Sequence, residues 1–218
     1  MKKQAMNDII GFAGKMRSGK GMAASYLHNH FGYEVVAFAD KLKEICVPLI
    51  GVDSVDVLDS MKNNNTKINL IIDEEFCEKV SYLTEVPAEY IKEVILSKTI
   101  NTVRELLQIL GTDVLRGYNE NWHVHKTIEK IIELRKSNKK VVIGDVRFKN
   151  EKLALESIGG SVYYIDKTFE INTDEHISEN SLSVNDFGFQ KNVILNNTPG
   201  NINLFLYNVK KTVSTQKD

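Results

Sequence analysis

A segment near the start of the chain, lying between an apolar run and a helix-like stretch, constrains the fold most. It reads Gly14-Lys15-Met16-Arg17-Ser18-Gly19-Lys20 and fits the pattern G-x-x-x-x-G-K. Asp8–Phe12 before it is predicted to be a strand, and Gly21–Phe31 after it a helix. Glycines let consecutive backbone amides turn toward an anion, and the helix N-terminus adds partial positive charge. The segment therefore predicts a phosphate-binding loop, with a glycine-rich turn carrying a surface lysine as the alternative.

The chain departs from the full pattern directly after Lys20. A Ser or Thr hydroxyl that binds magnesium usually follows this lysine, but here Gly21 and Met22 follow it. We therefore expect Mg²⁺ to be held mainly by substrate phosphates and water, with help from Ser18 or Asp145.

Short apolar runs rich in β-branched residues alternate with stretches of helical periodicity. The runs are Asp8–Phe12, Glu34–Phe38, Val141–Gly144, Ser161–Ile165 and Asn192–Leu195. This alternation predicts an α/β fold with a five-stranded, mainly parallel sheet and helices on both faces. Together with the phosphate-loop pattern, it indicates a P-loop NTPase fold with an architecture like that of the nucleoside monophosphate kinases. In such folds ligands bind at the carboxyl ends of the strands.

The interval between the second and third runs is too long for an ordinary crossover. Its periodicity predicts helices over Lys41–Leu49, Ile68–Leu83, Ala88–Leu96, Val103–Leu110 and Trp122–Arg135. We therefore expect one domain over residues 1–218 with a helical insertion at about 40–135.

Composition excludes several classes of protein. Hydrophobic residues make up 42% and charged residues 26%, so disordered, collagen-like and disulfide-scaffold chains are excluded. The net charge is −1 and the chain has no basic tail, so we expect that it binds neither nucleic acid nor a membrane. No signal peptide or membrane span is visible, which predicts a cytoplasmic protein. Cys46 and Cys77 match no metal or redox spacing and are expected to be buried reduced thiols.

The third apolar run ends in Asp145. An acid at the carboxyl end of a core strand, beside a phosphate loop, could order a magnesium-bound water. A turn, or an N-cap of the next helix, is the structural alternative.

Arginine is scarce in this chain, which has 23 lysines and five arginines, at positions 17, 104, 116, 135 and 147. Its planar fork binds phosphate or carboxylate through two hydrogen bonds, which lysine cannot do. Arg104 and Gln108 are four residues apart and so share a helix face, where a phosphate fork and a base-reading amide could meet. A solvated face with one buried amide is the alternative, and Arg116 could simply cap its helix end.

Five blocks in order over residues 11–179 resemble the bacteriophage deoxynucleoside monophosphate kinases. The resemblance covers Arg17–Lys20 with Gly-Met in place of the family's Asp-Thr, Phe38–Lys43, Arg104–Asp113 with Arg116 and Trp122, Asp145–Glu151, and His176–Glu179. Four of the five arginines fall inside these blocks, whereas Gly51–Lys98 shows little that matches.

The resemblance implies an enzyme of the host cytoplasm that converts ATP and a deoxynucleoside monophosphate into ADP and a deoxynucleoside diphosphate with Mg²⁺. Lys20 would hold the β- and γ-phosphates, Arg17 and Arg147 would stabilise the transferring phosphoryl group, and Asp145 would bind the metal through water. The implied ATP-binding residues are Gly14, Lys15, Ser18, Gly19, Lys20, Gly21 and Met22. The implied acceptor-binding residues are Asp40, Lys43, Arg104, Gln108, Thr112, Asp113, Arg116 and Trp122.

Several of these roles stay open. Asp40 could bind a sugar hydroxyl, hold Arg104 or cap the following helix, and Trp122 could stack on a base or belong to the core. His123 and His125 have no partner ligands nearby in the sequence, so no metal site is expected there. The segment 166–190 takes the place of a nucleotide-kinase lid in which His176, Ser178 and Glu179 could close on the donor; a plain surface loop is the alternative.

Two other functions compete with this hypothesis. One is a kinase for another small acceptor, such as dephospho-coenzyme A, and the other is a nucleotide-binding protein that has lost turnover, with Gly21-Met22 as the trace of decay. The sequence leaves open the accepted bases, the sugar preference and the oligomeric state, including a homodimer.

Overall fold

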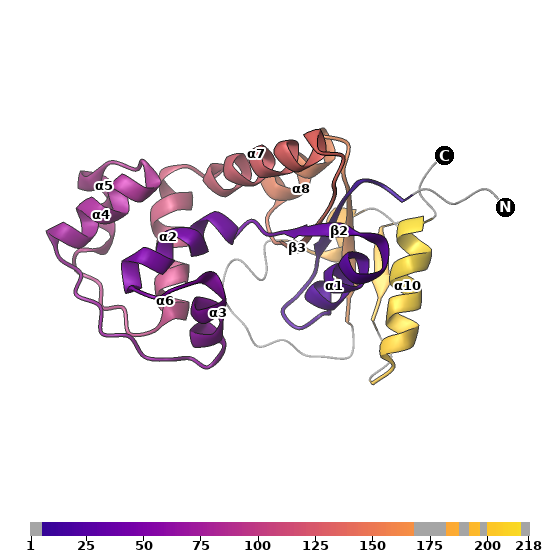
Figure 1. The fold of residues 1–218 in the computed structure, drawn as a ribbon, viewed down its shortest axis with the longest axis horizontal. Helices are drawn as coiled ribbons and strands as arrows, with labels where there is room; N and C mark the ends of the chain where they lie inside the picture. Colours follow the sequence, from indigo (N-terminus) through magenta and orange to yellow (C-terminus); the bar gives the residue numbers. More distant parts are fainter. Residues whose placement is uncertain (1–5, 168–181, 188–191, 197–199, 215–218) are drawn as a thin grey trace. The chain divides into compact units, whose positions relative to one another are not determined.

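A computed structural model describes residues 6–167, 182–187, 192–196 and 200–214 (Figure 1). The chain divides into a sheet unit, Met1–Phe38 with Thr127–Asp218, and a helical unit, Ala39–Lys126. Within the described ranges, no helix is both long and apolar enough to cross a membrane. The elements are β1 (Ile9–Ala13), α1 (Lys20–Phe31), β2 (Tyr33–Val36), α2 (Asp40–Ile50), α3 (Val55–Asn63), α4 (Glu74–Thr84), α5 (Ala88–Ile95), α6 (Val103–Gln108), η1 (Ile109–Arg116), α7 (Trp122–Lys136), β3 (Lys140–Val146), α8 (Lys149–Ser157), β4 (Ser161–Asp166), η2 (Val184–Phe187), β5 (Val193–Leu195) and α10 (Ile202–Ser214).

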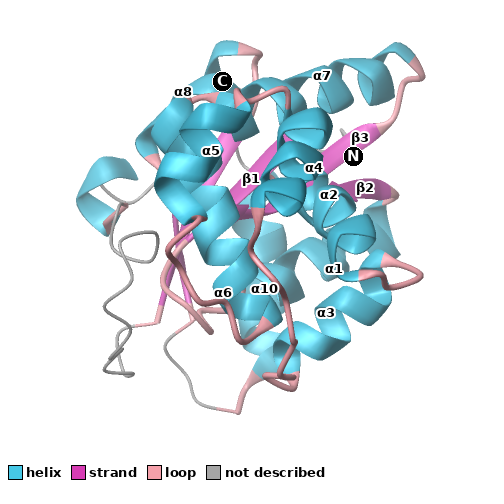
Figure 2. Ribbon diagram, turned by 90° about the vertical axis from the view of Figure 1, so that its left-hand side faces the viewer, coloured by secondary structure: helices cyan, strands magenta, loops and turns pink. Residues whose placement is uncertain are grey.

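The described strands form one five-stranded sheet in the order β2-β3-β1-β4-β5. Every neighbouring pair is parallel, and Figure 2 shows the strands in magenta among the helices. All five residues of the central strand β1 are buried. The predicted five-stranded parallel sheet is therefore confirmed.

Helices cover both faces of this sheet. On one face, α1 and α10 contribute Leu27, Phe205 and Val209 to a core shared with Ile10 and Tyr163. On the other face α8 packs closely, because a Cβ added to Gly11 would lie 2.9 Å from Leu155 Cδ1. This arrangement confirms the predicted α/β fold class with helices on both faces.

The helical unit has its own hydrophobic core, made by α2 to η1 and the start of α7. Cys46 and Cys77 lie in this core as free, buried thiols, as predicted. Burial raises the pKa of the Cys46 thiol to about 12, so this cysteine stays protonated at neutral pH. The unit ends at Lys126, inside α7, whereas the predicted insertion extends to 135.

The predicted helix Ile68–Leu83 is wrong in its first part. Ile68 N–H donates to Asn101 O at 2.8 Å, and Lys67 forms a bridge with Thr102, so the chain is extended there. The helix α4 begins only after Asp73, whose side chain accepts the Phe76 N–H at 2.8 Å and caps the helix. Helices α3 and α10 are additional to the predicted helices.

The predicted helix Val103–Leu110 continues further than expected. After Gln108 the chain passes directly into η1, a π-helix that ends at Arg116. π-Helices are rare and often occur at functional sites. This segment contains the Leu-Gly-Thr-Asp part of the third resembling block.

Candidate active site

The phosphate-loop candidate connects β1 to α1, and three of its residues have positive φ. These are Gly14 at 140°, Arg17 at 59° and Gly19 at 107°. A Cβ on Gly14 would lie 2.5 Å from Ile165 O, so no larger residue fits there. Arg17 is exposed although its backbone conformation is unfavourable for a residue with a side chain. Local strain of this kind is typical of functional loops.

Lys20 is the first residue of α1, and its side chain folds back over the loop. The Nζ group donates to Gly14 O at 2.5 Å and to Lys15 O at 2.7 Å. The ammonium group is thus held at the mouth of the loop, beside the helix N-terminus. This is the placement that a lysine binding a terminal phosphate needs.

Asn196, which was not predicted from the sequence, holds the loop at Ser18. Asn196 follows β5, and its Nδ2 donates to Ser18 O at 2.7 Å while its own N–H donates to Asp166 O at 2.8 Å. A polar residue directly after a predicted strand was the available signal, since the carboxyl ends of parallel strands meet at one edge. Ser18 itself is 1% exposed, and its Oγ has no hydrogen-bond partner in the described part of the chain.

Asp145 lies on β3 beside the start of the loop, because Val146 pairs in register with Ala13 of β1. Its Oδ1 accepts the Phe38 N–H at 2.9 Å. The N-cap residue of α8 is Phe148, so Asp145 does not cap that helix. A Cβ on the preceding Gly144 would lie 3.3 Å from Ala24 Cβ, which shows how closely β3 approaches α1.

Arg147 follows β3 and is positioned through its backbone. Glu151, 2% exposed, accepts the Arg147 N–H at 2.7 Å and the Phe148 N–H at 3.1 Å through its Oε2. The buried carboxylate therefore fixes the turn that carries the arginine. Sequence reasoning included Glu151 in a resembling block without giving it a role.

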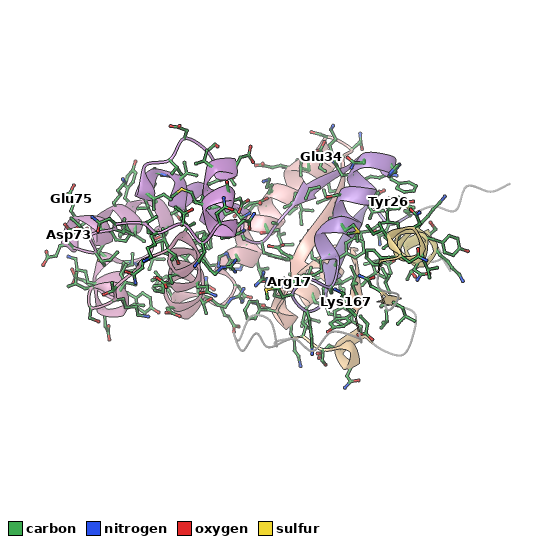
Figure 3. The ribbon with its side chains drawn as sticks, turned by 90° about the horizontal axis from the view of Figure 1, so that it is seen from below. Arg17, Tyr26, Glu34, Asp73, Glu75 and Lys167 are labelled. Atoms are coloured by element: carbon green, nitrogen blue, oxygen red, sulfur yellow. The ribbon has the colours of Figure 1, made fainter. Side chains whose placement is uncertain are left out.

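Cationic side chains gather at this edge of the sheet unit. Lys15, Arg17 and Lys20 belong to the loop after β1, Arg147 follows β3, and Lys167 follows β4. Figure 3 labels Arg17 and Lys167 at this edge. The loop and its surroundings thus combine a helix N-terminus with several cations, which suits a polyphosphate.

The two residues after Lys20 supply no oxygen ligand from their side chains. Gly21 is exposed, and a Cβ added there would meet no atom within 4 Å. Met22 is 43% exposed. A Ser or Thr side chain would therefore fit at position 21, but the chain has glycine there.

The acceptor candidates of the helical unit lie on α2, α6 and η1. The first turn of α2 packs on η1, because a Cβ on Gly111 would lie 2.8 Å from Leu42 Cδ2. Asp40 and Lys43 belong to this turn. The structure thus brings residues 39–43 of the second resembling block and the third block together within the helical unit.

Lys43 already has an ionic partner. Its Nζ lies 2.7 Å from Asp59 Oδ2, and Lys62 lies 2.8 Å from Asp59 Oδ1. Burial of Asp59 tends to raise the pKa of its carboxyl, but hydrogen bonds from Lys43 and Lys62 outweigh this and lower that pKa below its usual value. Any ligand that binds Lys43 would share it with this carboxylate.

The remaining acceptor candidates have different surroundings. Arg104 is exposed, Gln108 and Thr112 are half-buried, and Arg116 Nη1 donates to Glu120 O at 3.2 Å. Asp113 pairs with Lys98 at 2.6 Å.

Trp122 lies in the core of the helical unit, 7% exposed, and its indole N–H is directed at Thr84 O at 3.4 Å. This is the core alternative that the sequence left open. The lid candidates His176, Ser178 and Glu179 lie outside the described residues.

A family model and a curated viral protein match this chain under the same description. A model of the family described as deoxynucleotide monophosphate kinase matches residues 47–205. A curated protein of Acanthamoeba polyphaga mimivirus, named "Putative deoxynucleotide monophosphate kinase", is 29% identical over 183 residues, covering 78% of this chain and 80% of that protein. The dephospho-CoA kinase from Campylobacter jejuni aligns with a TM-score of 0.46 at 14% identity, covering 95% of this chain and 96% of that chain. Since the family match spans well over half of its length, the chain belongs to the deoxynucleotide monophosphate kinase family.

Proposed function

We propose that this protein transfers the γ-phosphoryl group of ATP to a deoxynucleoside monophosphate. The observation that carries the proposal is the phosphate loop closed around Lys20, in a chain of this kinase family. The family match begins after this loop, so the loop supports the proposal independently.

On the donor side, the backbone amides of the loop bind the phosphates and Lys20 neutralises the β- and γ-phosphates. Arg17 and Arg147 stabilise the charge on the transferring group. Gly14, Lys15, Ser18, Gly19, Gly21 and Met22 complete the ATP-binding loop, and Asn196 holds it in shape through Ser18 O.

The residues at this edge fit Mg²⁺ bound with the nucleotide. Asp145 offers a hard oxygen donor at the carboxyl end of β3, and Gly21 leaves the neighbouring space open. When bound, Mg²⁺ neutralises charge on the phosphates. Asp145 would hold it through a water molecule.

On the acceptor side, Arg104 and Arg116 bind the phosphate of the monophosphate, and Gln108 faces its base. Asp40 binds the sugar. Lys43, Thr112 and Asp113 complete the acceptor-binding residues. Trp122 supports the core of the unit instead of stacking on the base, because it is buried.

The chemistry needs no strong general base. An ionised oxygen of the acceptor phosphate attacks the γ-phosphorus, and the bond to the β–γ bridging oxygen breaks, leaving ADP. The acceptor phosphate is largely dianionic near neutral pH, since its second pKa is about 6. Positioning and charge neutralisation by the cations therefore supply the catalysis.

The test is ADP release by the purified protein with each deoxynucleoside monophosphate, each ribonucleotide and dephospho-coenzyme A. We expect turnover with at least one deoxynucleoside monophosphate. In Lys20→Ala the rate should fall by a factor on the order of 1000 without loss of the fold, because its Nζ group donates to two backbone carbonyls of a surface loop. Lys210→Ala, an exposed lysine of α10, is the matched control.

Other outcomes would favour the alternative functions. Turnover with dephospho-coenzyme A alone would make that compound the acceptor. Nucleotide binding without turnover would favour a nucleotide-binding protein that has lost its activity. Substantial turnover by folded Lys20→Ala would remove the phosphate-loop assignment.

A further inference from the structure

Four of the polar residues of the α6–η1 segment are spaced four positions apart: Arg104, Gln108, Thr112 and Arg116. An α-helix turns by about 100° per residue, which would place Arg116 about 120° around the axis from Arg104. A π-helix turns by only about 80° per residue. Because η1 is a π-helix from Ile109 onward, the offset of Arg116 falls to about 40°, and the four side chains form one polar stripe.

The burial of the apolar residues agrees with this register. Counted in the same way, the buried residues of the segment fall on the opposite side, between about 160° and 280° from Arg104. They are Val103, Leu106, Leu110, Gly111, Val114 and Leu115. The half-buried Leu107 and Ile109 lie between the two sides. The polar stripe is exposed at Arg104 and half-buried at its other three members. An uninterrupted α-helix would instead turn Leu115 to within about 20° of Arg104.

A hydrogen bond from the start of α7 reaches the backbone of this wide turn. His123, at the start of α7, is 6% exposed, and its Nε2 lies 3.0 Å from Gly111 O. A carbonyl oxygen only accepts, so His123 Nε2 carries the hydrogen. The ring of Trp122 packs edge-on against the His123 ring with centroids 5.1 Å apart.

The other side of the same turn is closed by α2. A Cβ on Gly111 would lie 2.8 Å from Leu42 Cδ2 and 3.8 Å from His123 Nε2. The turn is therefore packed between the start of α2 and the start of α7, and Gly111 is the residue that permits this approach.

We propose that His123 is a positioning residue for the acceptor phosphate. Its hydrogen bond to Gly111 O keeps η1 in the π-helical register that aligns Thr112 and Arg116 with Arg104. Without that donor, η1 relaxes toward an α-helix and Arg116 turns away from the stripe. The link to the acceptor rests on the proposed function, whereas the effect on η1 does not.

The test compares three variants. His123→Phe keeps a ring but removes the donor, His123→Gln restores an N–H near the Nε2 position, and His125→Phe changes an exposed histidine of the same helix as a control. Loss of one hydrogen bond of this kind should raise KM for the monophosphate about five- to tenfold in His123→Phe. We expect kcat and KM for ATP to stay within about twofold, and His123→Gln to recover most of the monophosphate affinity.

Hydrogen exchange of the peptide spanning 109–117 gives a second readout. It should become faster in His123→Phe and stay unchanged in His125→Phe. Gly111→Ala disturbs the turn from the side of Leu42 and should raise the same KM, so the proposal stays testable if His123→Phe fails to fold.

Three results would overturn the proposal. One is an unchanged KM for the monophosphate in folded His123→Phe. The second is a fall in kcat in that variant with an equal rise in KM for both substrates, and the third is the failure of His123→Gln to restore monophosphate affinity. If the wild type shows no turnover, the proposed function fails separately. Calorimetric binding of the monophosphate then replaces KM, and absence of binding by the wild type also overturns the role of His123.

Discussion

At the residue scale, Arg17 combines an unfavourable backbone conformation with an exposed side chain. Its φ of 59° is one that glycine adopts without cost, yet the chain places an arginine there. In a protein where lysine is the usual cation, this choice indicates that the guanidinium is needed.

Arg17→Gly should therefore separate stability from activity. We expect the free energy of unfolding to stay equal or rise by up to about 1 kcal/mol, because the positive φ is relieved. We expect kcat to fall by a factor on the order of 100, because the phosphoryl group loses a cation. Denaturant unfolding and steady-state kinetics measure the two effects, and Arg17→Lys, which keeps the charge and the strain, is the control. A less stable but active Arg17→Gly would contradict this account.

Arg104 and Arg135 offer a matched pair of substitutions. Arg104→Lys should raise KM for the monophosphate about tenfold or more and leave KM for ATP nearly unchanged, because the charge remains but the fork is lost. Arg135 binds Asp8 Oδ2 at 2.7 Å and Lys139 O at 2.8 Å, so Arg135→Lys should change stability and neither KM. If Arg104→Lys weakens ATP instead, Arg104 belongs to the donor site.

At the scale of elements, the sequence predicted strands better than helix ends. A strand such as β3 is specified by a continuous apolar run, and its observed bounds are close to the predicted ones. The start of α4 depended on a side-chain cap at Asp73 and on pairing of Ile68 with Asn101, which lies far along the chain. Periodicity alone carries neither kind of information.

The same limit applies to the candidate site. The phosphate loop is local, so its residues could be predicted from one segment. Asn196 and Glu151 act through backbone groups that only the folded structure brings near them. The π-helical register of η1 depends on packing with Leu42 and His123, and a 3.6-residue period does not reveal it.

Asp145 on β3 and Met22 on α1 allow the proposed magnesium binding to be tested. In Asp145→Asn the amide oxygen can still accept the Phe38 N–H, so the fold should survive while kcat falls about tenfold or more and the magnesium requirement rises. Met22→Thr should change magnesium dependence only modestly, since the residue is largely exposed. Magnesium titrations of ADP binding and of kcat test both.

A normal titration for Asp145→Asn would remove Asp145 from the metal site and leave it the structural role of holding Phe38. A large gain in activity for Met22→Thr would favour the impaired nucleotide binder over a competent kinase.

At the scale of the whole molecule, the proposed function assigns its chemistry to two compact units. The sheet unit carries the candidate phosphate loop, Asp145 and Arg147, and the helical unit carries the polar stripe from Arg104 to Arg116. Substitutions in the first should mainly affect ATP and kcat, and substitutions in the second should mainly affect the monophosphate.

The central claim is that the γ-phosphoryl group of ATP moves onto the phosphate of a deoxynucleoside monophosphate. The most direct measurement follows a phosphorus label from the γ-position of ATP into the products. The label should appear as the β-phosphate of a deoxynucleoside diphosphate, and Lys20→Ala should slow this transfer by a factor on the order of 1000. Label found only in inorganic phosphate, or retained in ATP with every deoxynucleoside monophosphate, would contradict it.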